Sequence, residues 1–481
     1  MVAFALWGAW AAILSAAACG SEKRLTDVAS EGGHQSGVGG NESGGAGPSS
    51  GGAGPSAGSA GISSGAADAS GTRGDSDASG SPSDGRPSVL ADAAALPVDA
   101  TERGDVAVQG FLHPGLLHSN EDFDRMRTKV AANAQPWKAG WDRLVANGHS
   151  ALTWTARPAP VVYRGADGVH PENYAQLFND AAAAYALALR WKISGDAAYA
   201  DKAIEVLGAW SAVLTSISGT SDKFLAAGLY GYELANAGEI MRTYTGWSTA
   251  DFTRFKSMMQ NVFYPMNHDF LLRHNGACIS HYWANWDLCN MDSMIAIGVL
   301  LDDRAIYDEA VEYFKNGAGN GAIGKAVFFV HPGHLGQWQE SGRDQGHNTL
   351  GIGLMGAFCE MAWKQGDDLY AYDDNRFLAG AEYVATYNLG NDVPYVTYDN
   401  CDNVNQTVIA SAGRGDIRPI WELVYNHYVN RRGLAAPNVA SYAAMVRPEG
   451  GGGDYGPNSG GYDQLGYGTL TSTLDMPKID P

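Results

Sequence analysis

Two short polar segments carry most of the residues that suit acid–base chemistry. Residues 273–290 contain His281, Tyr282 and Asn285, and residues 337–348 contain Arg343 and His347. His and Tyr side chains exchange protons, and an Arg guanidinium binds a carboxylate through two parallel hydrogen bonds. Together these residue types suit proton transfer on an anionic substrate.

Helical spacing predicts that side chains within each segment share a face. Each segment leads into a long apolar run, so we expect each to form the N-terminal start of a buried helix. His281 and Asn285 are four residues apart, and Glu340, Arg343 and His347 follow at spacings of three and four. Polar residues interrupt two further apolar helices, at Asn179 and Asp180 and at Tyr230, Glu233 and Asn236.

Apolar helices alternate with amphipathic ones after residue 173. A helix that is apolar on all sides must be buried, whereas its amphipathic partner lies outside. The expected apolar helices are 173–194, 225–244, 281–301 and 348–364, and their partners are 198–214, 249–262, 303–316 and 373–389. Strand-like runs are short (326–330 and 393–397), and residues 450–468 are expected to form loops with at most a strand. The pattern predicts an all-α fold, an α/α toroid (incomplete α/α barrel) with short β elements; an irregular helical bundle or solenoid is the alternative.

In a toroid the inner helices run parallel, so their N-termini meet at one end of a central cavity. Helix N-termini offer free N–H groups and partial positive charge, which favour carboxylates. A cavity lined by His, Tyr, Arg, Asn, Gln and Trp suits an anionic sugar chain. The candidate substrate-binding residues are His274, Tyr230, Asn179, Gln337, Gln339, Glu340 and Trp286.

Each candidate also has a purely structural interpretation. His281 could be a solvated helix-end residue, and His274 could simply be exposed in a loop. Trp286 could be core, and Arg343 could only pair with a neighbouring acid. The case therefore depends on the clusters occurring together.

The first 108 residues differ in composition from the rest. Residues 1–19 are apolar and end in three alanines and Cys19, as in a bacterial lipoprotein signal; a plain cleaved signal peptide is the alternative. Residues 20–108 are rich in Gly, Ser, Ala and Asp and predict a disordered linker. Residues 109–481 then form the toroid domain. We expect a secreted or cell-surface protein, either periplasmic or a lipoprotein that touches the membrane only through lipid on Cys19.

The net charge of −20 argues against a nucleic-acid partner, because phosphate binding needs a basic surface. Any anionic substrate must instead be held by a few local cations.

Cys289 and Cys359 lie in apolar runs and are expected to be buried thiols, while a Cys278–Cys401 disulfide is left open. The sequence lacks an HExxH motif or a tight Cys/His pair, so no metal is expected, although a structural cation is an alternative use of the histidines.

Four segments have a familiar sequence: residues 113–127 (HPGLLHSNEDFDRMR), 181–210, 285–298 (NWDLCNMDSMIAIG) and 336–354 (GQWQESGRDQGHNTLGIGL). They resemble the alginate-lyase-like superfamily of polysaccharide lyases, and within it polysaccharide lyase family 38. The resemblance covers residues 112–428. It implies an α/α toroid that cleaves 1,4-linked uronic-acid polymers such as alginate or glucuronan by β-elimination, without a metal or organic cofactor. We expect a monomer.

The resemblance carries roles over only in part. Classical members use Asn-Asn-His at an inner helix start and an Arg followed seven residues later by a Tyr. Here the first region reads His281-Tyr282-Trp283, and Leu350 stands seven residues after Arg343. We expect Arg343 and Asn285 to neutralise the substrate carboxylate, His281 to be the base and Tyr282 or His347 the acid. His274, Tyr230 and Tyr398 are reserve candidates.

Two other functions are weighed against the lyase. A glycoside hydrolase would need two acidic residues, Glu340 with Asp180 or Glu233. We expect Arg343 to favour the ionised form of Glu340, which weakens that alternative. The second alternative is a non-catalytic surface lipoprotein that binds a uronan. Only a lyase makes an unsaturated product.

Overall fold

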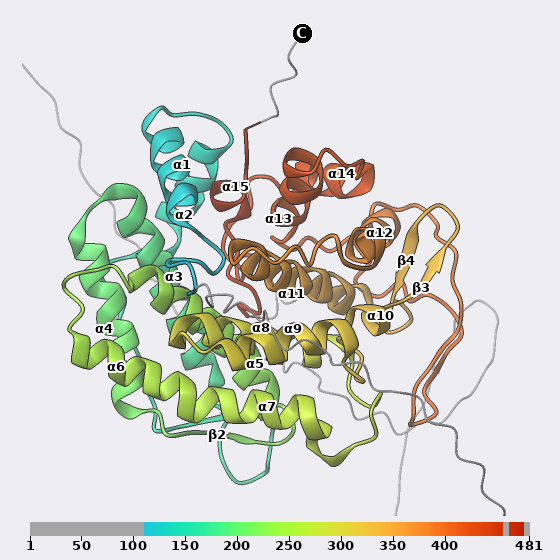
Figure 1. Ribbon diagram of the computed structural model, residues 1–481, viewed down its shortest axis with the longest axis horizontal. Coiled ribbons are helices and arrows are strands. Elements are labelled where there is room, and N and C mark those ends of the chain that lie inside the picture. The colour runs from blue at the N-terminus through green and yellow to red at the C-terminus, as the bar shows by residue number, and fades with distance from the viewer. Residues whose placement is uncertain (1–109, 456–460, 476–481) are drawn as a thin grey trace, which may run out of the picture. The chain divides into compact units, whose positions relative to one another are not determined.

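The computed structural model describes residues 110–455 and 461–475, which are mostly helical (Figure 1). The expected signal, linker and Cys19 lie outside these residues. None of the described helices is long and apolar enough to cross a membrane. The first helices are α1 (Asn120–Ala131), α2 (Trp137–Ala146), η1 (Gly148–Ser150), α3 (Tyr174–Ser194), α4 (Ala197–Val213), α5 (Lys223–Met241), α6 (Thr249–Met258), η2 (Met259–Phe263), α7 (Tyr264–Arg273) and η3 (His274–Gly276). They are followed by α8 (Ala284–Leu301), α9 (Arg304–Asn316), α10 (Ile323–Ala326), α11 (Gln345–Lys364), α12 (Tyr372–Asn388), α13 (Trp421–Tyr425), η4 (Asn426–Arg431), α14 (Pro437–Val446) and α15 (Gly468–Thr471).

The strands form three small two-stranded sheets. β1 (Val161–Arg164) pairs in parallel with β2 (Ser216–Gly219). β3 (Val327–His331) and β4 (Leu335–Trp338) are antiparallel, as are β5 (Tyr398–Asp399) and β6 (Asn405–Gln406). Residues 393–397, an expected strand, contain none.

Four inner helices pack side by side in chain order, α3 on α5, α5 on α8 and α8 on α11. The side chains of α5 are buried from Phe224 onward and those of α8 from Ala284 to Leu300. Outer helices return the chain, with α4 against α3, α9 against α8 and α12 beside α11. Figure 1 shows α5, α8 and α11 in the middle, α4 and α6 on one side and α12 to α14 on the other. This is the predicted α/α toroid, and the helix ends lie within a few residues of those expected.

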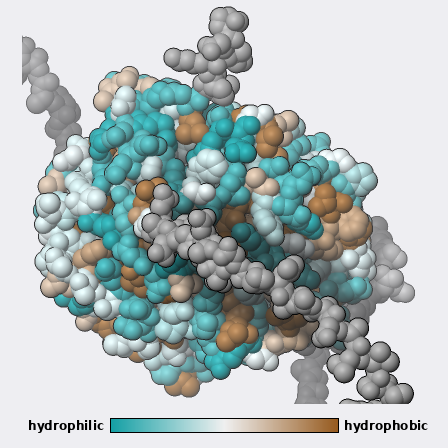
Figure 2. All heavy atoms as spheres, viewed as in Figure 1, coloured by the Kyte–Doolittle hydropathy of each residue, from teal (hydrophilic) through white to brown (hydrophobic). Residues whose placement is uncertain are grey.

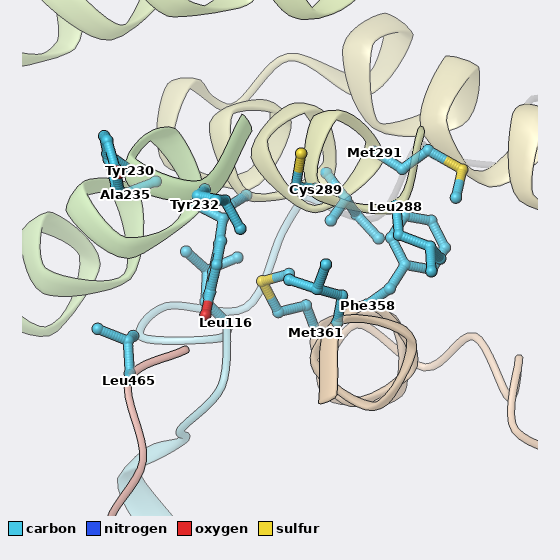
Figure 3. Close-up of a cluster of buried hydrophobic side chains, with 14 of the residues drawn as sticks. Leu116, Tyr230, Tyr232, Ala235, Leu288, Cys289, Met291, Phe358, Met361 and Leu465 are labelled. Carbon is cyan, nitrogen blue, oxygen red and sulfur yellow. The ribbon is translucent and has the colours of Figure 1, made fainter. Parts of the chain in front are cut away.

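Small residues let α5 and α8 approach closely. A Cβ atom on Gly228 would lie 2.4 Å from the Cys289 sulfur, and one on Gly231 would lie 2.1 Å from the Ser293 hydroxyl. Side chains from α5, α8 and α11 then fill the centre, together with Leu116 and Leu465 from distant parts of the chain (Figure 3). Cys289 and Cys359 are buried free thiols, as predicted.

The expected start of α8 at residue 281 is wrong, because residues 278–283 are held in an irregular conformation. Cys278 forms a disulfide with Cys401. The Asn320 amide donates to the carbonyl oxygens of Ser280 (3.1 Å) and Tyr282 (2.7 Å). These carbonyls are therefore not available to a helix. His281 and Asn285 consequently do not share a helix face.

The helix predicted from residue 348 starts three residues earlier, at Gln345. The Asp344 side chain caps it by accepting the backbone N–H of His347 at 2.8 Å. Glu340 and Arg343 precede the helix in a turn, in which the Arg343 N–H donates to the Glu340 carbonyl at 2.8 Å. Glu340 and Arg343 are therefore neighbours because of this turn, and not because they share a face of a helix, as expected.

The C-terminal residues return to the middle of the toroid. Gly451 bridges to Gly466, and the Tyr232 hydroxyl donates to the backbone carbonyl of Asp463 at 3.2 Å. The described part of 450–468 is otherwise loop, as expected, up to the start of α15. On the face seen in Figure 2, outside the grey atoms, hydrophobic residues form separate small patches among hydrophilic ones.

His113 fastens the beginning of the domain to the C-terminal ends of two inner helices. Its Nδ1 lies 2.5 Å from Glu239 in α5, and its Nε2 lies 2.7 Å from Asp302, which follows α8. Burial lowers the pKa of His113, but the two carboxylates outweigh burial and leave the pKa raised. The protonated imidazolium therefore bridges two helices.

We predict that His113→Ala lowers the free energy of unfolding at pH 6 by about 1–2 kcal/mol. A raised folded-state pKa means that this contribution is complete below the usual value of 6.5. It is lost as the pH rises through the folded-state pKa, so the difference shrinks by pH 8.5. Urea unfolding at both pH values measures this. His170→Ala is the control, since His170 pairs with Asp167 in an exposed loop. If His113→Ala lowers the free energy of unfolding equally at both pH values, the protonated His113 does not stabilise the contact with Glu239 and Asp302.

Candidate active site

The starts of α8 and α11 are joined by hydrogen bonds from the backbone of α8. The Gln339 side-chain oxygen accepts the Ala284 N–H at 3.0 Å, and the Glu340 carboxyl group accepts the Asn285 N–H. Both N–H groups lie in the first turn of α8, where no helical partner exists. The structure thereby brings Asn285, Glu340 and Arg343 together, although they come from two segments.

Glu340 is fully buried, with one oxygen 3.5 Å from the Arg343 guanidinium. The other oxygen has no hydrogen-bond partner among the described residues. Burial raises the pKa of Glu340 to about 8, and the charge of Arg343 opposes this only in part. The expectation that Arg343 keeps Glu340 ionised is therefore wrong: the contact is long, and Arg343 is shared with other groups.

Arg343 is held at the edge of the site with its charge only partly offset. Its side chain is 15% exposed, its Nε lies 3.6 Å from Asp344, and its guanidinium lies 5.0 Å from the centre of the Trp283 ring. A guanidinium stacked on an indole keeps its edge available for hydrogen bonds. Trp283 ends the irregular stretch directly before α8.

His347 and Asp344 form a pair in the first turn of α11. The His347 Nδ1 lies 2.6 Å from the Asp344 carboxylate, whose other oxygen caps the helix. Burial lowers the pKa of His347, and Asp344 offsets that effect in part. The ring is 34% exposed, and no described residue bonds its Nε2. A neutral imidazole oriented through Nδ1 presents an Nε2 lone pair that can accept a proton.

Arg418 extends the site toward the middle of the toroid. It is buried, and it donates to the Gly346 carbonyl at 3.4 Å, to the Thr349 hydroxyl at 3.3 Å and to the Gln464 side chain at 2.8 Å. Its charge acts on His347 and on Asp463. The sequence analysis did not find Arg418, because nothing local in Arg-Pro-Ile marks it as a buried cation.

Arg164 at the end of β1 is a second buried cation that the sequence analysis missed. It donates to the Tyr230 hydroxyl at 2.9 Å and acts electrostatically on Asp463. The Tyr230 candidate therefore lies in this buried group, on α5. Arg164 contacts this group because β1 pairs with β2, which leads directly to α5.

Asn179 lies in a separate cavity of about 620 Å³. Its side-chain oxygen lies 2.7 Å from the His149 Nε2, and His149 stacks on Trp154 with ring centres 4.4 Å apart. The Phe178 ring lies between this cavity and Tyr230, 5.9 Å from the tyrosine. The cavity is lined by Ala146, Asn147, Gly148, His149, Trp154, Phe178, Asn179, Gly453, Asp454, Gly461 and Tyr462.

His281 and Tyr282 occupy the rim before α8. The exposed His281 ring lies 2.5 Å from Asp402 through Nδ1 and contacts the edge of Tyr282. No described contact joins His281 to Arg343. The Tyr282 side chain is buried, and its hydroxyl accepts a hydrogen bond from Asn275 at 3.1 Å.

Other candidates support the site from behind. His274, expected in an exposed loop, is buried, and its Nε2 lies 3.1 Å from both Asp287 and the Tyr313 hydroxyl. Trp286 packs on Tyr282, with ring centres 4.6 Å apart. Gln337 exchanges two 2.8 Å hydrogen bonds with the backbone of Val396. These side chains fix the position of the helix starts.

Tyr398, a reserve candidate, is also buried and lies near Trp283. Its hydroxyl donates to Asn320 at 3.2 Å, and the centres of the two rings are 6.4 Å apart. Within the described residues, the one group compact enough to hold a metal is Cys278, Cys401 and Asp402. The two sulfurs are joined in a disulfide, so they do not offer thiolates.

The alginate lyase family model matches residues 131–393. Among solved structures, alginate lyase A1-III from Sphingomonas species A1 has a TM-score of 0.51 and 15% identity, covering 78% of this chain and 100% of that chain. Two variants of alginate lyase A1-III complexed with a tetrasaccharide, one His-to-Ala and one Tyr-to-Phe, have TM-scores of 0.50 and 0.51. Their identities are 17% and 16%, covering 75% and 78% of this chain and 97% and 99% of those chains.

These structural similarities show the shared toroid fold. A search of curated proteins found no match. The family model spans more than half of the 481 residues, including the starts of α8 and α11. The chain therefore belongs to the alginate lyase family and is a polysaccharide lyase.

Proposed function

We propose that the enzyme cleaves a 1,4-linked uronic-acid polymer, such as alginate or glucuronan, by β-elimination at the starts of α8 and α11. The observation that supports this most is the Asp344–His347 pair, which lies directly beside Arg343. The proton on C5 of a uronate is barely acidic because the neighbouring carboxylate is negative. Neutralising that carboxylate stabilises the charge that develops when the proton leaves.

Three groups are suited to hold the substrate carboxylate. The Arg343 guanidinium supplies charge and paired donors, and Asn285 has a side-chain amide nitrogen that can donate a hydrogen bond. Glu340 carries a proton at neutral pH, since its pKa is about 8, and can donate it in a hydrogen bond. The buried acid thereby acts as a neutral donor.

His347 is the group that we assign as the base. Its Nε2 takes the proton from C5, the C5–H electron pair becomes the C4=C5 double bond, and the C4–O4 bond breaks. The same imidazolium returns the proton to O4, the new chain end. Asp344 is a positioning residue that holds Nδ1 and stabilises the imidazolium. Tyr282, the other candidate acid, has its hydroxyl bonded to Asn275, and His281 is paired with Asp402 at the rim.

The direct test is incubation with alginate blocks, glucuronan and glycosaminoglycans while following ultraviolet absorbance. The new double bond absorbs, so a rise with alginate or glucuronan supports the proposal and identifies the polymer. Chain shortening without absorbance would instead indicate the hydrolase.

The hydrolase alternative gains one supporting observation, the proton carried by Glu340. Neither of the two second carboxylates expected for it, Asp180 and Glu233, is suited to the role. Asp180 accepts hydrogen bonds from Trp154, Trp210 and the Arg157 backbone, and burial raises the pKa of Glu233 well above its usual value. A binding lipoprotein without activity would leave the polymer intact.

We also propose that the catalytic domain is exported and tethered by the linker, with lipid on Cys19. This rests on residues 1–108 of the sequence alone. Labelling of growing cells with a fatty-acid analogue tests it: Cys19→Ser should abolish the label.

We predict that His347→Ala lowers kcat by roughly 10²–10⁴-fold, the range for removal of a general base. His281→Gln is the matched control and should stay within about threefold of wild type, because its described contacts are at the rim. Circular dichroism confirms folding of both. If His281→Gln is inactive and His347→Ala is active, the base is His281.

We predict that activity falls as the pH rises through about 8, because Glu340 then ionises and repels the substrate carboxylate. The Gln side chain of the Glu340→Gln variant is uncharged at every pH. This variant should remain active near pH 7 and should not lose activity as the pH rises through about 8. The pH profile of kcat/KM from pH 6 to 10 measures this. If kcat/KM of the variant falls at the same pH as that of the wild type, the fall is caused by another group.

A further inference from the structure

The cavity of about 620 Å³ beside the start of α3 has no part in the proposed reaction, since none of the residues that line it belongs to the proposed catalytic group. Three distant parts of the chain form its walls: residues 146–154, residues 178–179 of α3 and the C-terminal residues 453–454 and 461–462. Ligand-binding cavities of proteins usually have volumes of about 300–1,000 Å³. The cavity is therefore large enough to hold a ligand.

Aromatic rings from all three parts of the chain line the cavity. Trp154 and Phe178 are half-buried, and Tyr462 is buried. The Trp154 ring is fixed in place, because its indole N–H donates to Asp180 at 2.9 Å and one of its faces stacks on His149. Aromatic rings offer rigid apolar surface, on which the C–H groups of a sugar ring can pack.

Hydrogen bonds between the three parts of the chain hold the walls together. The Asn147 amide donates to the Asp454 carboxylate at 2.8 Å and to the Tyr462 hydroxyl at 3.3 Å. The Asn179 side-chain oxygen lies 2.7 Å from the His149 Nε2. The walls are thus joined before any ligand binds, which lowers the cost of ordering them around one.

The lining carries little charge. Among the described residues that line the cavity, none is Lys or Arg, and Asp454 is the one acidic residue. Arg157, which acts electrostatically on His149, lies outside the lining. A carboxylate in the cavity would meet no cation, whereas sugar hydroxyls can bond to the side chains of Asn147, Asn179 and Asp454. The cavity therefore suits the ring face and hydroxyls of a sugar unit whose carboxylate points outward.

The cavity lies at the end of the toroid where the inner helices start. The starts of α5 and α8 are level, because Gly228 lies against Cys289 and the two occupy the same position in their helices. Arg164 joins the starts of α3 and α5, since it donates to the Tyr230 hydroxyl at 2.9 Å and lies 4.9 Å from the centre of the Tyr174 ring. The start of α8 is in turn bonded to the turn before α11. The cavity and the proposed catalytic group thus lie at one end of the molecule.

We propose that this cavity is a second carbohydrate-binding site, which holds a sugar unit of the polymer through its ring face and hydroxyls while another part of the same chain is cleaved at the starts of α8 and α11. This rests on the proposed lyase function, because it takes the polymer as the ligand. Two contacts on one chain bind far more tightly than either alone, since the second forms at a high effective concentration. The site therefore lowers KM for the polymer and leaves the chemical step unchanged.

Gly148 allows the cavity to be blocked without removing a side chain. It lines the cavity, and a Cβ atom there would meet no other atom within 4 Å, so Gly148→Phe can place a ring in this space. Gly208→Phe is the matched control, because a Cβ atom on Gly208 also meets nothing within 4 Å and this residue lies on the outer helix α4. Ala146→Phe blocks the cavity from the exposed end of α2 and is the second variant.

The first test follows ultraviolet absorbance on the polymer that the wild type cleaves. Gly148→Phe should raise KM about tenfold or more and leave kcat within about threefold of the wild-type value. Gly208→Phe should change neither constant. A fall in kcat at unchanged KM would overturn the proposal, because a remote binding site contributes to binding alone.

The second test measures binding without turnover, as the retardation of the His347→Ala variant in gels that contain the polymer. Adding Gly148→Phe leaves the charge of the protein unchanged, and the dissociation constant should rise about tenfold or more. Since the lining holds no Lys or Arg, the same ratio is expected at low and high salt. A ratio that falls to one at high salt would show that charge holds the polymer there and would overturn the proposal.

Values of KM and retardation that are unchanged by both Gly148→Phe and Ala146→Phe would refute the second binding site. If no polymer yields absorbance but Gly148→Phe still weakens the retardation by one of them, the lyase function fails and the binding site remains. Should Gly148→Phe not fold, Ala146→Phe decides the question by the same measurements.

Discussion

The joint between the starts of α8 and α11 is the constraint on which the site depends. Two N–H groups in the first turn of α8 donate to Gln339 and Glu340, so the turn before α11 satisfies donors that a helix start leaves unpaired. The same joint removes Glu340 from water, which raises its pKa, and holds Arg343 beside Glu340. A shift of either helix would break the hydrogen bonds and separate Asn285 from Glu340 and Arg343.

The joint in turn requires close contact between the inner helices. Glycines at positions 228 and 231 let α5 approach α8, and in this close packing Asp292 is buried with no hydrogen-bond partner among the described residues. Burial raises the pKa of Asp292 well above its usual value, so it is most stable when neutral. Asp292 and Glu233 are thus interior carboxyl groups whose neutral form burial favours, whereas buried Glu360 on α11 is kept ionised by Arg431 and Lys364. Asp344 and Asp463, near the site, keep their charge beside an arginine.

The sequence predicted the layers of the fold well, because apolar and amphipathic helices differ in a local pattern that burial alone dictates. It predicted the sites less well wherever distant contacts override helical spacing. His281 was expected on a helix face, but the Cys278–Cys401 disulfide and Asn320 hold its segment out of the helix. Arg164, Arg418 and Asp463 come from three remote segments with no common motif, and only the closed toroid brings them together. Glu340 was expected to be ionised because its neighbour in sequence is a cation; the degree of its burial could not be read from spacing.

The local charges explain how an acidic chain can act on an acidic polymer. With a net charge of −20, long-range attraction cannot bring a polyuronate to the site, and at physiological salt such fields fade within about 8 Å. What matters is the local set of charges near the helix starts. Arg343 lies beside Asp344, and Arg164 and Arg418 lie near Asp463, while burial favours the neutral forms of Glu340 and Glu233. Protonating buried acids therefore has the same effect as adding cations, without placing further arginines where their desolvation would cost stability.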